Sequence, residues 1–111
     1  MGNKYTISFI MDIARKNNSQ ITKISAQNNG IESLDGFYSL HSFPKLLLLD
    51  LRNNKISTLL GISRSSNVKE LLLDGNPICE KLSEPIEYVT EAKRFFTSLE
   101  YLDGHLLDNN L

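Results

Sequence analysis

The sequence predicts an α/β solenoid, in which short parallel strands on one side alternate with returning segments on the other. Leucine and asparagine dominate the composition, with eighteen and eleven of 111 residues. Asparagine favours turns, yet here it recurs inside leucine-rich stretches. Asn29, Asn54 and Asn76 end three similar stretches, at spacings of 25 and 22 residues. This pattern, L-x-x-L-x-L-x-x-N-x-L at about 20–29 residues, predicts a short leucine-rich-repeat solenoid of about three repeats.

Each repeat is expected to begin with a short strand whose alternate side chains point into the core. The fourth and sixth positions are the inward ones: Ile24, Ala26, Leu49, Leu51, Leu71 and Leu73. The asparagine that follows is expected to turn the chain and to bond backbone groups of the neighbouring coil. Apolar residues spaced three apart, within 31–37 and 56–62, then return along the convex side.

The two ends of the solenoid are expected to carry caps, because a repeat cannot bury its apolar face alone. Residues 6–17 predict an amphipathic helix with one apolar face, formed by Ile7, Ile10, Ile13 and Ala14. Ser83-Glu-Pro85 is a helix-start signal. Apolar residues follow it at helical spacing: Tyr88, Ala92, Phe95, Phe96 and Leu99. Residues 99–104 are expected to form a last, incomplete strand that closes the sheet.

The predicted organisation is one domain of three parts, since about 100–150 residues make a single domain. A capping helix takes residues 1–20, three leucine-rich repeats take 21–78, and a helix-strand cap takes 79–111. A net charge of −1 argues against a strongly basic nucleic-acid-binding arm. The longest apolar run, Leu46–Leu49, is too short to span a membrane.

Chemistry-bearing motifs are scarce in this sequence. The single cysteine, Cys79, cannot form an internal disulfide, which argues against a secreted, disulfide-stapled scaffold. It is expected to act as a small buried hydrophobe rather than a catalytic thiol. The sequence shows no glycine-rich phosphate loop and no metal-ligand cluster. We therefore expect a protein that is not an enzyme, with no cofactor, no metal, no small-molecule substrate and no membrane contact.

The end of the chain carries a more specific pattern. LLLDGNPIC at 71–79, Tyr88 and Phe96 in the helix, and LEYLDGHLL at 99–107 stand in a characteristic order. This pattern resembles the last repeat and C-terminal cap of the leucine-rich domain of the nuclear RNA export factors, the TAP family. Spliceosomal and phosphatase-regulating repeat proteins share such a cap, but Cys79 and His105 favour the export family. His105 is expected to cap backbone groups at the end of the solenoid.

The resemblance, which covers about residues 20–107, implies a role. In that family the repeat domain lies between an RNA-recognition domain and a heterodimerising domain, and a nucleoporin-binding module follows. It implies a non-catalytic domain that engages RNA cargo, adaptor proteins or both in mRNA export or a related nuclear RNA pathway. The chain would then be an excised domain whose protein works in the nucleus or shuttles to the cytoplasm. The alternative is a protein-interaction module of the spliceosomal or phosphatase-regulator type, with no RNA contact.

Two sets of surface residues are candidates for binding. The first set faces the concave side of the sheet: Leu48, Asp50, Arg52, Glu70, Leu72, Asp74 and Tyr101. With Lys23 and Asp103, which face the same side, the concave face has four acids against two bases, so it suits a protein partner better than a phosphate backbone. Leu48 and Leu72 could equally pack against neighbouring strands. The second set, which forms either an RNA-binding edge or only a solvated surface, is Arg64, Lys69, Lys93 and Arg94.

Overall fold

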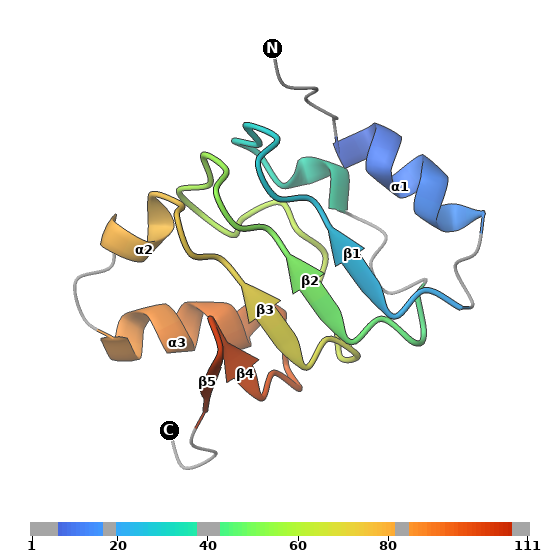
Figure 1. Ribbon diagram of the computed structural model, residues 1–111. Helices are drawn as coiled ribbons and strands as arrows, with labels where there is room; N and C mark the ends of the chain where they lie inside the picture. The colour runs from blue at the N-terminus through green and yellow to red at the C-terminus, as the bar shows by residue number, and fades with distance from the viewer. Residues whose placement is uncertain (1–6, 17–19, 38–42, 82–84, 108–111) are drawn as a thin grey trace.

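The computed structural model describes residues 7–16, 20–37, 43–81 and 85–107, and within them one mixed α/β fold (Figure 1). Five short strands form one sheet in chain order: β1 (Lys23–Ser25), β2 (Leu48–Asp50), β3 (Glu70–Leu72), β4 (Tyr101–Leu102) and β5 (His105–Leu106). The first four strands are parallel, and β5 runs antiparallel to β4. The helices are α1 (Ile7–Arg15), a 3-10 turn η1 (Asp35–Phe37), α2 (Ile78–Lys81) and α3 (Pro85–Phe95).

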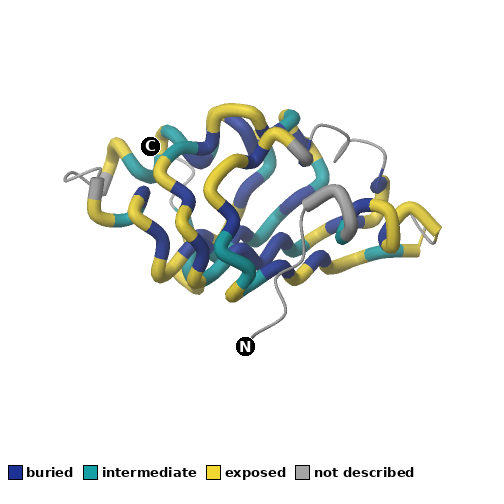
Figure 2. The backbone as a smooth tube through the Cα atoms, turned by 90° about the horizontal axis from the view of Figure 1, so that it is seen from above, coloured by how far each residue is buried: buried dark blue, intermediate teal, exposed yellow. Residues whose placement is uncertain are grey.

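The core lies between the sheet and the returning segments, where Figure 2 shows the buried positions of successive turns gathered. All six inward positions predicted from the repeat are buried: Ile24, Ala26, Leu49, Leu51, Leu71 and Leu73. The apolar residues predicted on the returning segments are buried as well: Ile31, Leu34, Phe37, Ile56, Leu59 and Ile62. Burial therefore confirms the predicted alternation and the predicted path back along the other side.

Buried asparagines join successive turns, as the repeat predicted. The amide oxygen of Asn54 accepts from the backbone N–H groups of Asn29 at 2.9 Å and Ile31 at 3.1 Å. Its amide nitrogen donates to the carbonyls of Ala26 at 3.0 Å and Leu51 at 2.9 Å. One side chain thus satisfies donors and acceptors of two turns.

Asn76 repeats this arrangement one turn later. Its oxygen accepts from Ile56 N–H at 3.0 Å, and its nitrogen donates to Leu51 O at 2.9 Å. The residue before each of these two asparagines has a positive φ, with Asn53 at 58° and Gly75 at 80°. The two residues of the pair Asn53-Asn54 therefore have different roles. Asn53 makes the left-handed turn, and Asn54 bonds the neighbouring coil.

Among the side chains that the structure describes, the N-terminal helix differs from its prediction at Ile13. α1 falls within the predicted range, whose ends, Thr6 and Asn17, lie outside the described residues. Ile13 was expected on the apolar face, but it is 53% exposed, while Met11 and Ala14 are buried. Residues 10, 11 and 14 cluster on one side of a helix, and residue 13 lies about 100° from the centre of that cluster.

The C-terminal helix is shorter than predicted. α3 begins at Pro85 and ends at Phe95, so Ala92 and Phe95 are buried within it, whereas Phe96 and Leu99 are buried after its end and Tyr88 is half-buried. Ser83 and Glu84 of the start signal lie outside the described residues. The short helix α2 was not predicted. α1 lies at the β1 end of the sheet, and α2 and α3 lie at the other end (Figure 1). None of the helices in the described ranges is long and apolar enough to cross a membrane.

The end of the sheet contradicts the prediction that residues 99–104 close it. β4 pairs with β3, but β5 then pairs with β4 from the other side and becomes the edge strand. Asp103 and Gly104 connect the two strands with φ values of 52° and 83°. Positive φ at both central residues is what a two-residue type I′ hairpin turn requires. An Asp-Gly pair is a strong hairpin signal, so this strand could have been found in the sequence.

Candidate binding surfaces

In-register pairing lines up the predicted concave residues on one face of the sheet. Residues in register on parallel strands point to the same side. One row across the strands contains Lys23, Leu48, Glu70, Tyr101 and Leu106. The next row contains Ser25, Asp50 and Leu72. The structure therefore brings together side chains from four separate stretches of the sequence.

The concave face is most apolar toward β4 and β5. Tyr101 is 40% exposed and lies directly opposite Leu106, which is 71% exposed. Leu48, Glu70 and Leu72 are half-buried, and Asp74 is exposed. Leu106 was missing from the predicted set, because its strand was not recognised.

Asp50 corrects the predicted set, because its side chain is fully buried and cannot touch a partner. Its carboxylate accepts from Arg52 through the backbone N–H at 3.2 Å, Nε at 3.0 Å and a terminal nitrogen at 2.8 Å. Burial alone would raise the pKa of Asp50, but the bonds and charge of Arg52 outweigh it and hold that pKa below its usual value. Asp50 therefore orients Arg52 on the face rather than contacting a partner.

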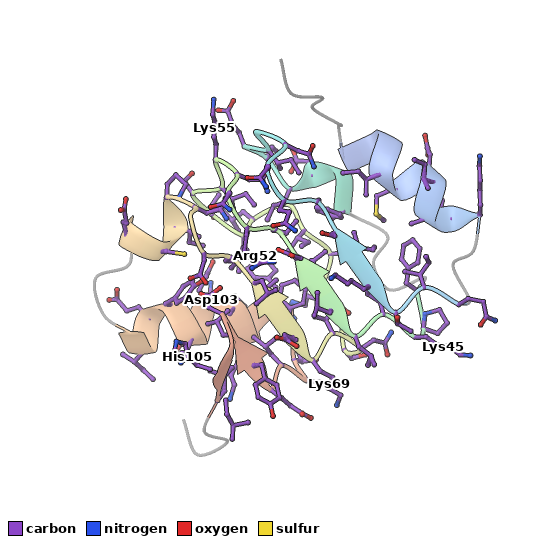
Figure 3. All side chains as sticks on the ribbon, in the orientation of Figure 1. Lys45, Arg52, Lys55, Lys69, Asp103 and His105 are labelled. Atoms are coloured by element: carbon purple, nitrogen blue, oxygen red, sulfur yellow. The ribbon has the colours of Figure 1, made fainter. Side chains whose placement is uncertain are left out.

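Arg52 lies just past the carboxyl end of β2, where Asp50 holds it (Figure 3). Its side chain is 39% exposed, and two of its guanidinium nitrogens bond Asp50. The hydrogen bond and charge of Asp50 raise the pKa of Arg52, and the nearby Asp74 adds to the shift. The buried carboxylate of Asp50 thus largely compensates the positive charge of Arg52.

Asp103 performs the capping that was expected of His105. Its carboxylate accepts from Leu73 N–H at 2.6 Å and Asp74 N–H at 3.1 Å, at the end of β3. The hydroxyl of Tyr88, from α3, donates to the same carboxylate at 2.6 Å. His105 is instead exposed in β5. The network joins the last parallel strands to α3.

Cys79 belongs to the same network and is half-buried rather than a plain buried hydrophobe. Its thiol donates to Leu73 O at 3.2 Å and lies 3.4 Å from the Tyr88 hydroxyl. Burial raises the pKa of Cys79, and burial with the Asp103 bond raises the pKa of Tyr88 strongly. Both groups therefore stay protonated near neutral pH, where a protonated thiol is a poor nucleophile.

The four residues of the predicted basic edge do not form one continuous surface. Lys69 and Lys93 line one groove of about 530 Å³ together with Ser98 and Leu107. Within it, the amine of Lys69 lies 3.4 Å from a carboxylate oxygen of Glu100. Figure 3 shows Lys69 beyond the amino ends of the strands, on the side opposite Lys55.

The remaining two basic residues lie elsewhere. Arg94 lines a different groove along α3 and pairs with Glu91 at 3.4 Å. Arg64 is exposed and precedes Ser65, whose backbone bonds Phe95 O. Across the described parts of the chain, no group of three or more His, Cys, Asp or Glu side chains could hold a metal ion.

Comparison with known proteins matches this chain to one family. The family model for the NXF1/2/3/5 leucine-rich repeat domain covers residues 1–104. Human nuclear RNA export factor 2 is 31% identical over 100 residues, which are 87% of this chain and 16% of that protein. The fission yeast (Schizosaccharomyces pombe) mRNA export factor mex67 is 28% identical over 110 residues, 92% of this chain and 18% of that protein.

Solved structures agree with the sequence comparison. The Mex67 leucine-rich repeat domain from Chaetomium thermophilum superposes with a TM-score of 0.67 at 31% identity, covering 93% of this chain and 71% of that one. A structure of Chaetomium Mex67:Mtr2 subunits matches with a TM-score of 0.66 at 28% identity, covering 93% and 68%. The chain spans less than a fifth of the curated relatives' length. It belongs to the nuclear RNA export factor family, and the part we describe is a leucine-rich repeat domain of that family.

Proposed function

We propose that this chain is a non-catalytic binding domain of a nuclear RNA export factor, acting in mRNA export or a related nuclear RNA pathway. Its parent protein would work in the nucleus and shuttle to the cytoplasm, with the neighbouring domains as further partners. Three leucine-rich repeats at 21–78, capped by 1–20 and 79–111, would hold the binding face. Family membership supports the pathway, since the relatives are named as export factors.

The concave face is the proposed contact surface for nuclear adaptor or RNA-processing proteins. The observation that carries this proposal is the exposed pair Tyr101 and Leu106, which continues a row of side chains across the sheet. Aromatic and aliphatic anchors surrounded by polar groups are typical of protein interfaces. The Mex67 relative occurs in a complex with Mtr2 subunits, which supports protein partners for the parent protein.

A domain replacement tests the export role. The leucine-rich repeat domain of fission yeast mex67 would be replaced by this chain, and nuclear poly(A) RNA would be measured by in situ hybridisation. We expect the chimera to export mRNA and its Tyr101→Ala/Leu106→Ala variant to retain poly(A) RNA in the nucleus. The matched control, Ile13→Ala/Leu60→Ala, removes two apolar side chains that are 53% and 64% exposed elsewhere.

Two outcomes would contradict parts of this proposal. A chimera that fails with the unaltered chain would count against the export role. Normal export by the Tyr101→Ala/Leu106→Ala chimera would move the contact surface away from the concave face.

The groove with Lys69 and Lys93 supports RNA contact as a second candidate function. It unites two of the four predicted basic residues beside Ser98. Labelled single-stranded RNA would be titrated at about 50 and 200 mM salt, because binding through phosphates weakens steeply over this range. Lys69→Gln/Lys93→Gln should weaken binding, and Arg94→Gln should not. Absence of binding at both salt concentrations would favour an interaction module without RNA contact.

A further inference from the structure

Charge is unevenly distributed over the concave face. On the β1 side lies Lys23, and in the middle the charge of Arg52 is compensated by Asp50. On the β3 side lie Glu70 and, just after the strand, Asp74. Glu70 takes part in none of the ion pairs found among the described side chains. The β3 part of the face is therefore acidic, whereas Leu106 on β5 also lines the groove that contains Lys69 and Lys93.

The exposed apolar side chains of this face lie beside the acidic part, because Tyr101 is in register with Glu70. Tyr101 and Leu106 are directly opposite each other in the sheet. Other large apolar side chains that are exposed in the described chain lie singly on different segments: Ile13, Leu47, Leu60 and Ile86. Leu48 occupies the same row as Tyr101 on the far side of Glu70, and Leu72 lies in the next row. The row thus reads apolar, acidic, apolar, apolar from β2 to β5.

The length of this row suits a short extended segment. Neighbouring strands lie about 4.8 Å apart, so the distance from Leu48 on β2 to Leu106 on β5 is about 14 Å. An extended chain covers that distance with about four to five residues. Its apolar side chains would contact Leu48, Tyr101 and Leu106, and a side chain between them would meet Glu70.

We propose that this face binds a short extended peptide that carries Arg or Lys between aliphatic residues. The cation pairs with Glu70, with Asp74 adding to the attraction, and the aliphatic residues pack on Tyr101 and Leu106. Arginine suits this site because its guanidinium can bond a carboxylate through two nitrogens. A phosphate backbone would be repelled by the same carboxylates. This proposal rests on the proposed function, for which it names the chemistry of the protein partner.

Three fluorescent peptides test the chemistry directly. They share one aliphatic sequence and differ at a central position, which is Arg, Gln or Glu. We expect the Arg peptide to bind this chain about fivefold more tightly than the Gln peptide, since a partly exposed ion pair contributes up to about that much. The Glu peptide should bind most weakly. Higher salt should reduce the advantage of the Arg peptide.

Variants assign the binding to this face. Glu70→Gln/Asp74→Asn should reduce Arg-peptide binding to the level of the Gln peptide while leaving Gln-peptide binding unchanged. Tyr101→Ala/Leu106→Ala should weaken all three peptides. The Ile13→Ala/Leu60→Ala control should leave all three affinities unchanged, and circular dichroism would verify that each variant is folded.

Several outcomes would overturn the proposal. Equal affinities for the Arg and Gln peptides would overturn the proposed preference for a cation. If binding of both peptides still depended on Tyr101, the proposed function would remain intact. Absence of any Tyr101-dependent peptide binding would overturn the peptide proposal. The export role is tested independently by measuring nuclear poly(A) RNA in the mex67 chimera. Displacement of the Arg peptide by single-stranded RNA, or a Tyr101-dependent dimer in sedimentation, would assign the face to a different occupant.

Discussion

The middle turns of this domain and its last turn satisfy their backbone groups with different side chains. After β2 and β3, the buried amides of Asn54 and Asn76 both accept and donate, and they bridge two turns. After β4, the carboxylate of Asp103 only accepts, from two N–H groups at the end of β3 and from the hydroxyl of Tyr88.

The difference follows from what lies on each side of the turn. A middle turn has a neighbouring coil on both sides and must satisfy carbonyls as well as N–H groups, which an amide can do and a carboxylate cannot. The last turn has N–H groups of β3 on one side and α3 on the other. The carboxylate therefore bonds the strand, and its remaining oxygen fastens a helix that comes from a different part of the chain.

The largest expected effect is at Asn54, the centre of the middle turns. Asn54→Leu should lower the free energy of unfolding by about 3 kcal/mol, because several buried backbone groups lose their partners at once. Urea unfolding followed by circular dichroism measures this loss. Asn53→Gly is the neighbouring control, since Asn53 is exposed with a φ of 58° that glycine adopts readily. Equal stability of Asn54→Leu and the wild type would contradict the bridging role of the amide.

A smaller loss is expected at the last turn. Asp103→Ala should cost about 2 kcal/mol, the usual scale for removing a charged hydrogen-bond acceptor. Tyr88→Phe should cost less, because it removes one of the three bonds. In a double-mutant cycle the two losses should fall short of additivity, which isolates the Tyr88–Asp103 bond. Full additivity would contradict a stabilising bond between Tyr88 and Asp103.

The smallest effect separates two glycines with similar backbone angles. Gly75 in a middle turn has a φ of 80°, and Gly104 in the hairpin has a φ of 83°. Alanine at either position pays for the left-handed backbone. An added Cβ at Gly75 would also collide with the side chain of Asn53, whereas at Gly104 nothing lies within 4 Å. Gly75→Ala should therefore be less stable than Gly104→Ala by about 1 kcal/mol, and equal unfolding midpoints would contradict this.

The middle of the fold was predictable because one pattern recurs in phase. Positions such as Leu49 and Leu71 alternate with a period of two, and Asn54 and Asn76 mark the turns, so burial and bonding follow from spacing alone. The end of the chain has no such repetition. Asp103-Gly104 is a hairpin signal. The short apolar stretch before it predicts an incomplete last strand, and no apolar alternation after it indicates a further strand.

The candidate site was predictable only as a face. Strand alternation assigns Asp50 to the concave side, but it does not reveal that Arg52 folds over it. Which side chains cover one another depends on rotamers and neighbouring strands, and spacing contains no information on either. The same applies to Lys93 and Arg94, which are adjacent in sequence and line different grooves.

The Asp103-Gly104 hairpin also sets a limit on length. The place beside β4, where one more turn of the coil would add its strand, is occupied by β5, which is two residues long and runs the opposite way. A second molecule stacking head to tail on this edge would meet a short strand of the opposite direction, so the parallel coil does not continue across this edge. An engineered longer version would have to receive its extra turn before β4 and keep this ending.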